Sequence, residues 1–282
     1  MRFVPINQSM SKKKVLIIAQ EMEPYTEGSL LAQLANKLPL YLNTNDCEIR
    51  ILMPRFGSVN ERRHRLHEVV RLSGMNIIVN DDDYPLIIKV ASLPGSRIQV
   101  YFLDNDDFFK RKFLFENEEG IEFADNLERS VFFSKGAIET VRKFGWAPEI
   151  IHCHGWFTAL IPLYIRTAYK QDPVFQNSKI IYSLVKDQPT NITFEALRTK
   201  ALINNIDPII MLDAKTDSGA DLHRAAIKNS DGIIFVEGDL PEQYYQYVET
   251  FGKKKLDAPV TENFGKDYLN FYELLMAENI SE

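Results

Sequence analysis

Two histidines at the end of a predicted strand are the side chains best placed to do chemistry. His152 and His154 close a short apolar run, and Gly155 follows them directly. Alternate residues of a strand point to the same face, so we expect both imidazoles on one side of a sheet and Cys153 on the other. A metal could bind such a pair, but no third ligand is evident, and we predict no metal site. Buried polar residues at a strand end are the alternative interpretation.

A glycine-containing turn near the start of the chain is the second candidate site. Glu21, Gly28 and Ser29 lie between an apolar run and a series of leucines at helical spacing. Ser29 is a favourable helix N-cap, and with Gly28 it could form an anion-binding turn. A strand-to-helix turn that needs a glycine explains the same residues. The carboxylate of Glu27 would repel a phosphate at this place.

The elements that must position these residues alternate between strands and helices. This order predicts an α/β fold: a doubly wound, Rossmann-like, mostly parallel sheet with helices on both faces and a β-hairpin insertion. Ligands of such sheets bind at the carboxyl ends of the strands. We expect residues 186–219 to be irregular. The predicted strands are 15–19, 48–53, 75–79, 86–91, 97–103, a run ending at 154, 179–185 and 232–236, and the predicted helices are 30–42, 125–144, 160–169 and 268–276.

Composition narrows the classes of function. The chain has 282 residues and a net charge of −6, which argues against a nucleic-acid partner. No apolar run approaches the roughly 18 residues of a membrane span, so we expect no membrane association. Two cysteines in apolar runs predict free buried thiols and a cytoplasmic location. We expect a flexible extension over residues 1–13 and one domain over residues 14–282.

Several segments, taken together, resemble the bacterial glycogen synthase and plant starch synthase family. They occur in the family's order between residues 14 and 252, and they cover the first of the family's two Rossmann-like domains. The segment from His152 to Trp156 resembles the family's His-x-His-Asp-Trp stretch. The other matching segments are 14–31, 38–39, 50–57, 125–129 and 221–237.

The resemblance implies a role for seven residues and no cofactor. The family transfers glucose from ADP- or UDP-glucose to an α-1,4-glucan. By resemblance, catalytic roles fall on His154 and Asp125, although a carboxylate at a helix N-terminus explains Asp125 as well. The residues implied in binding the donor or the glucan are Glu21, Gly28, Ser29, His152 and Tyr182.

Other positions depart from the family's pattern. Glu27 stands where the family has lysine, and Gly155 where it has aspartate or asparagine. Tyr182 and Ser183 replace a histidine and an asparagine. These changes remove polar contacts to the donor and the sugar. The resemblance also covers only the first of the family's two domains, and in the family the second binds most of the sugar nucleotide. We therefore expect this chain alone to lack synthase activity.

Three functions remain open from the sequence. The first is the N-terminal domain of a synthase-type glycosyltransferase that needs a second chain to supply the nucleotide-binding half. The second is a non-catalytic module that holds a glucan or a protein partner. An unrelated Rossmann-like nucleotide binder is the third, and the missing Gly-x-Gly-x-x-Gly speaks against a dinucleotide enzyme. We expect α-glucan or sugar nucleotide as ligand, and a homodimer or a separate partner chain at the exposed cleft face.

Overall fold

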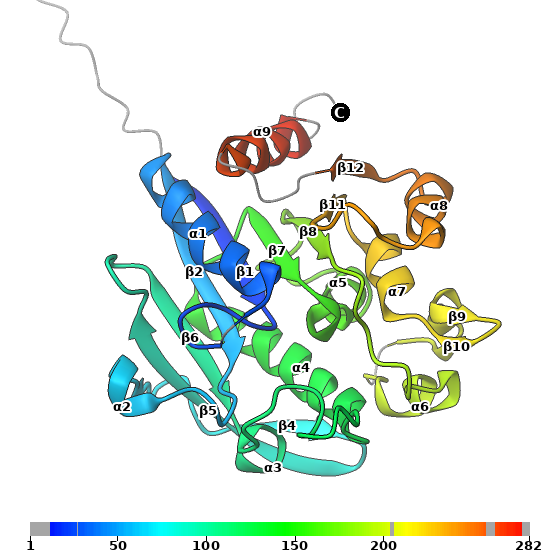
Figure 1. Ribbon diagram of the computed structural model, residues 1–282, viewed down its shortest axis with the longest axis horizontal. Helices are drawn as coiled ribbons and strands as arrows, with labels where there is room; N and C mark the ends of the chain where they lie inside the picture. The colour runs from blue at the N-terminus through cyan, green and yellow to red at the C-terminus, as the bar shows by residue number, and fades with distance from the viewer. Residues whose placement is uncertain (1–11, 27, 204–205, 258–262, 278–282) are drawn as a thin grey trace, which may run out of the picture.

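A computed structural model describes residues 12–26, 28–203, 206–257 and 263–277. Within these residues one ten-stranded sheet forms the centre of the molecule, in the order β12-β11-β8-β7-β1-β2-β6-β5-β3, with β4 paired to β5 (Figure 1). The strands of this sheet are β1 (Lys13–Ala19), β2 (Cys47–Pro54), β3 (His67–Glu68), β4 (Met75–Val79), β5 (Asp82–Ser92), β6 (Gln99–Asp104), β7 (Ile150–His154), β8 (Lys179–Leu184), β11 (Gly232–Phe235) and β12 (Lys254–Asp257).

The pairing follows the predicted fold class. Neighbouring strands from β12 through β1 to β6 run parallel. Strand β5 is antiparallel to β6, and β3 and β4 are antiparallel to β5, which gives the predicted hairpin insertion. Strand β1 lies between β2 and β7 and is buried from Val15 to Ala19, as its continuous apolar run predicts. The fold-class prediction is confirmed.

Helices cover both faces of the sheet. They are α1 (Leu30–Thr44), α2 (Glu61–His64), α3 (Asp106–Phe109), α4 (Asn126–Phe144), α5 (Leu160–Arg166), α6 (Phe194–Lys200), α7 (Leu222–Asn229), α8 (Glu242–Thr250) and α9 (Phe264–Ala277). Helices α4, α5 and α7 pack in series on one face. Helix α9 packs beside α1 on the other face (Figure 1). The helix predicted over residues 268–276 is therefore present and folds back on the domain.

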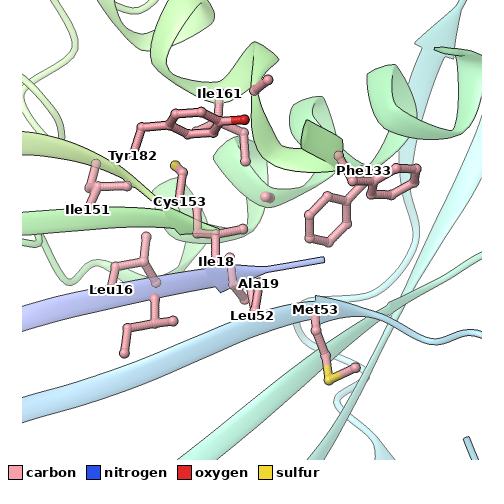
Figure 2. Close-up of a cluster of buried hydrophobic side chains, with 14 of the residues drawn as sticks. Leu16, Ile18, Ala19, Leu52, Met53, Phe133, Ile151, Cys153, Ile161 and Tyr182 are labelled. Atoms are coloured by element: carbon pink, nitrogen blue, oxygen red, sulfur yellow. The ribbon is translucent and has the colours of Figure 1, made fainter. Parts of the chain in front are cut away.

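A cluster of buried side chains fills the space between the sheet and the α4–α5 layer. Figure 2 shows Cys153 of β7 and Tyr182 of β8 pointing to the same side, towards Ile161 of α5. Leu16 and Ile18 of β1 lie in the same cluster. Cys153 therefore points away from the two histidines, as the strand alternation predicts.

The expectation of an irregular stretch over residues 186–219 is wrong. Helix α6, a 3₁₀ helix over Pro208–Ala214, and strand β9 (Lys215–Thr216), which pairs with β10 (Gly219–Ala220), all lie in it or at its end. Each is seven residues or shorter, so the apolar periodicity spans too few turns to be recognised. Strand β1 begins at Lys13, the last residue of the expected extension, and residues 1–11 lie outside the described structure.

Candidate functional site

The carboxyl ends of three central strands meet at one edge of the sheet. The amide of Gln20, just after β1, donates to the carbonyl of His154 at 3.3 Å. The amide of Gly155, just after β7, donates to the carbonyl of Ser183 in β8 at 3.0 Å. The candidate residues on these strands are thereby brought to the edge at which parallel sheets bind ligands.

The turn after β1 is organised by local hydrogen bonds. The hydroxyl of Ser29 accepts from the amide of Ala32 at 2.9 Å, which confirms that Ser29 is the N-cap of α1. Gly28 has φ +102°, a conformation that favours glycine. Burial raises the pKa of Glu21, although hydrogen bonds from Gln20 and Ser29 oppose the rise. A carboxylate therefore faces this turn, and Glu27 lies outside the described residues.

The two histidines share a face, as predicted, but neither is accessible. Their ring centroids are 4.1 Å apart, and both side chains are fully buried. His152 Nδ1 lies 2.6 Å from the hydroxyl of Tyr272, and Nε2 lies 2.8 Å from Ser183 Oγ. Neither ring nitrogen of His154 has a partner within the described structure. Helix α9 supplies Tyr272 and so covers His152.

Burial determines the charge of both imidazoles. It lowers the pKa of His154 to about 3, and it lowers the pKa of His152 well below its ordinary value, with the neighbouring His154 adding to the effect. Both rings are therefore neutral at neutral pH. In this conformation neither ring can exchange a proton with a ligand in solvent.

Tyr182 is not brought together with the histidines. It is fully buried on the opposite face of the sheet, where its hydroxyl lies 2.7 Å from Nδ1 of His223 in α7. The next residue, Ser183, points to the histidine face and contacts His152. Alternation along β8 places these two neighbours on opposite sides, so the strand pattern itself contains this distinction.

Asp125 stands at the N-terminus of α4 and pairs with an arginine. Its two carboxylate oxygens each lie 2.6 Å from a guanidinium nitrogen of Arg111, and its side chain makes no capping hydrogen bond. Arg111 also lies over the ring of Phe123 at 4.6 Å. Asp125 thus anchors the segment between α3 and α4.

A pocket of about 550 Å³ opens next to the strand ends, and we call it the strand-end pocket. Trp156 contributes from the turn after β7, and Asp187 from the turn after β8. The segment before α4 closes the other side. The residues that line this pocket are Phe113, Leu114, Phe115, Glu116, Glu122, Asn126, Trp156, Asp187, Gln188, Pro189 and Thr190.

The lining combines aromatic rings with carboxylates and amides. Trp156 is buried edge-to-face against Phe115, with ring centroids 4.8 Å apart, so it packs within the wall and stiffens it. Glu122 accepts hydrogen bonds from the amide and hydroxyl of Thr190 at 3.0 Å, which joins the two sides of the pocket. Three of the described lining residues are acidic. The described lining contains no lysine and no arginine.

Sequence reasoning missed a segment that supplies five of the eleven described residues lining the pocket. Residues 113–122 read Phe-Leu-Phe-Glu-Asn-Glu-Glu-Gly-Ile-Glu, without helical or strand periodicity. The available signal was a pair of phenylalanines followed directly by a run of acidic residues in a connecting segment. Among the seven residues implied by resemblance, all of which are described, none lines the strand-end pocket.

The described part of the chain holds no group of three histidine, cysteine or acidic side chains arranged to bind a metal. Within the same residues, no helix is long and apolar enough to cross a bilayer.

Comparisons with known proteins agree on one family. The chain is 39% identical over 172 residues to a glycogen synthase of Chlorobium limicola, covering 61% of this chain and 35% of that protein. It is 36% identical over 221 residues to the glycogen synthase of Chlorobaculum tepidum, covering 77% and 44%. The chain therefore spans less than half the length of these relatives.

A solved structure shows the same fold. The catalytic domain of starch synthase IV from Arabidopsis thaliana, bound to ADP and acarbose, superposes with a TM-score of 0.65 at 19% identity. The superposition covers 94% of this chain and 50% of that one. The family pattern described as the starch synthase catalytic domain matches residues 14–239. The chain belongs to the glycogen and starch synthase family.

Proposed function

We propose that this chain is the glucan-holding part of a synthase-type glucosyltransferase, and that it binds an α-1,4-glucan in the strand-end pocket. On its own it transfers no glucose from a sugar nucleotide. The observation that carries the proposal is the described lining of that pocket, where aromatic rings stand beside acidic and amide side chains and no cationic side chain is present.

A glucan fits this lining because it is uncharged and rich in hydroxyls. The apolar C–H faces of glucose pack on aromatic rings, and Phe113 presents such a ring with 44% of its surface exposed. Carboxylates such as Glu116 accept hydrogen bonds from sugar hydroxyls, and the amide of Gln188 can both donate and accept. A few polar groups in a mainly apolar cleft are typical of small-molecule sites.

A sugar nucleotide fits the same lining poorly. Its diphosphate carries negative charge, and the carboxylates of Glu116, Glu122 and Asp187 would repel it. The Arabidopsis relative was solved with both ADP and acarbose, so the family provides for both ligand types. We propose that the nucleotide is bound by a second domain or a second chain.

A protein-docking role is the second candidate. Phe113 and Ile121, beside or near the pocket, expose 44% and 63% of their surfaces. Exposed apolar side chains gathered at one site are typical of an interface. The occupant would be a second copy of the chain or a separate partner, and light scattering at tens of micromolar would detect a dimer.

The free, buried Cys47 and Cys153 support a cytoplasmic location for the protein.

The test is calorimetric titration of maltoheptaose into the native chain and two variants. Phe113→Ala removes the exposed ring of the pocket, and we expect affinity to fall at least fivefold. Val70→Ala is the matched control, because Val70 is 78% exposed and does not line the strand-end pocket. Equal affinity of both variants and the native chain for maltoheptaose would show that the glucan does not bind in the strand-end pocket.

A further inference from the structure

A second pocket lies beside the strand-end pocket and differs from it in charge. It has a volume of about 310 Å³ and is formed by the loop around Tyr25 and by the segment from Ser58 to His64. We call it the Arg63 pocket. Among the described residues, Leu114 is the one that lines both pockets. The described lining of the Arg63 pocket has no acidic side chain, whereas that of its neighbour has three.

Arg63 is an unpaired cation within the described structure. Its guanidinium has no ion pair or hydrogen bond to any described residue, and its side chain is exposed. Arg55 pairs with Asp104 at 2.8 Å, and Arg111 pairs with Asp125 at 2.6 Å. Arg62 and Arg65 are exposed and, like Arg63, have no ion pair to a described residue, but they do not line this pocket. Arg63 is therefore the guanidinium that faces the pocket among its described lining residues.

Neutral donors accompany the guanidinium. The side-chain oxygen of Asn60 accepts from the backbone amide of Arg63 at 2.9 Å, which leaves the amide nitrogen of Asn60 able to donate. Ser58 adds a hydroxyl to the lining. The ring of His64, also in the lining, packs edge-to-face on Tyr25, with centroids 4.8 Å apart. A cation, an amide and a hydroxyl, in a site whose described lining has no carboxylate, match an anion with several oxygens.

We infer that the Arg63 pocket binds a phosphate monoester, with Arg63, Asn60 and Ser58 as hydrogen-bond donors to the phosphate oxygens. The pocket has the volume of roughly ten water molecules at about 30 Å³ each, which is more than a bare phosphate fills. The remaining space, beside Tyr25 and His64, holds a small polar organic group such as a hexose. The ligand class is therefore a small sugar phosphate.

The test is titration of the full chain with three probes: inorganic phosphate, glucose 6-phosphate and glucose. We expect glucose 6-phosphate to bind more tightly than inorganic phosphate, and glucose to leave this pocket empty. If inorganic phosphate binds as tightly as glucose 6-phosphate, the anion alone supplies the affinity and the organic part of the proposal is wrong. Absence of binding by both phosphates would overturn the whole proposal.

Two single-charge variants locate the site. Arg63→Gln should weaken glucose 6-phosphate binding roughly tenfold to a hundredfold, because it removes a charge-assisted hydrogen bond. Arg62→Gln removes the same charge from the neighbouring exposed residue, which does not line the pocket, and should change affinity by twofold at most. Equal weakening by both variants would mean diffuse attraction and would overturn the proposal. Thermal unfolding of both variants confirms that they fold.

Failure of this proposal would leave the proposed function standing. The two pockets share only Leu114 among their described lining residues. Phe113→Ala and Arg63→Gln therefore report on the glucan and the phosphate separately.

Discussion

The hydroxyl of Tyr272 lies 2.6 Å from Nδ1 of His152, although 120 residues separate the two in the chain. Helix α9 thereby packs on His152, in the middle of the strand whose His-x-His sequence resembles the family's catalytic segment. Lys13 at the start of β1 pairs with Glu273 at 2.6 Å, which holds the same helix at a second point. Access to His152 from this side requires this helix to move.

Removing the Tyr272 hydroxyl should destabilise the fold. Tyr272→Phe leaves a buried ring nitrogen of His152 without its partner, which costs about 1–3 kcal/mol of unfolding free energy. Tyr245→Phe is the control, because the Tyr245 hydroxyl makes no hydrogen bond to the described residues and its ring is half-buried. Urea unfolding measures the free energy of unfolding of both variants. Equal midpoints for the two variants would show that the bond to His152 contributes nothing.

Stability should fall as the pH is lowered from 7 towards 5.5. Burial lowers the pKa of His154 to about 3 and that of His223 to about 4, and the pKa of His152 shifts in the same direction. In the unfolded chain these imidazoles bind protons near pH 6.5, whereas in the folded chain they do not. Their contribution to the free energy of unfolding is therefore complete above pH 6.5 and is lost as the pH falls below it. Each of these imidazoles contributes a slope approaching about 1.4 kcal/mol per pH unit.

Urea unfolding at a series of pH values measures this slope. A free energy of unfolding that stays constant from pH 7 to 5.5 would contradict neutral buried imidazoles.

Restoring a side chain at Gly155 should be costly. Gly155 has φ +79° and ψ 169°, a backbone region that is essentially restricted to glycine. A Cβ there would also lie 2.2 Å from the side-chain oxygen of Gln20, which accepts from the amide of Phe157. We expect Gly155→Ala to lower the free energy of unfolding by about 2–5 kcal/mol, from backbone strain and overpacking together.

Gly120→Ala separates these two causes. Gly120 also has a positive φ, +75°, but no described atom lies within 4 Å of the position that a Cβ would take. It should therefore show strain alone, about 1–2 kcal/mol. If thermal unfolding shows the same loss of unfolding free energy for both substitutions, the close approach of Gln20 does not contribute to the cost at Gly155.

Asp125→Asn should affect the segment before α4 more than glucan affinity. The variant loses the charge of the pair with Arg111, which is partly exposed, so the cost in unfolding free energy should stay below about 1 kcal/mol. Asp125 does not line the strand-end pocket, and we expect the dissociation constant for maltoheptaose to change by twofold at most. A tenfold loss of affinity for maltoheptaose in calorimetric titration would instead show that Asp125 belongs to the glucan-binding site.

The sequence contained the frame of the fold but only part of the site. Continuous apolar runs such as Val15–Ala19 and leucines at helical spacing after Ser29 predicted β1 and α1, because local pattern determines such elements. The i, i+2 spacing also predicted that His152 and His154 share a face. Which helix covers that face depends on the long-range contact with Tyr272, and no local pattern contains it.

The resemblance transferred residue roles without their surroundings. Tyr182 occupies a position at which the family has a histidine, yet it lies buried on the opposite face of the sheet and contacts His223. The segment 113–122 forms the strand-end pocket by packing against residues that follow β8, with 68 positions between Glu122 and Thr190. Only the tertiary structure brings these two segments together.

The most direct test of the account is a pair of calorimetric titrations of the native chain, one with maltoheptaose and one with ADP-glucose. The acidic and aromatic lining of the strand-end pocket predicts binding of maltoheptaose and no detectable binding of ADP-glucose. Binding of ADP-glucose in the absence of maltoheptaose binding would contradict the account, because it would assign this chain to the donor and not to the glucan.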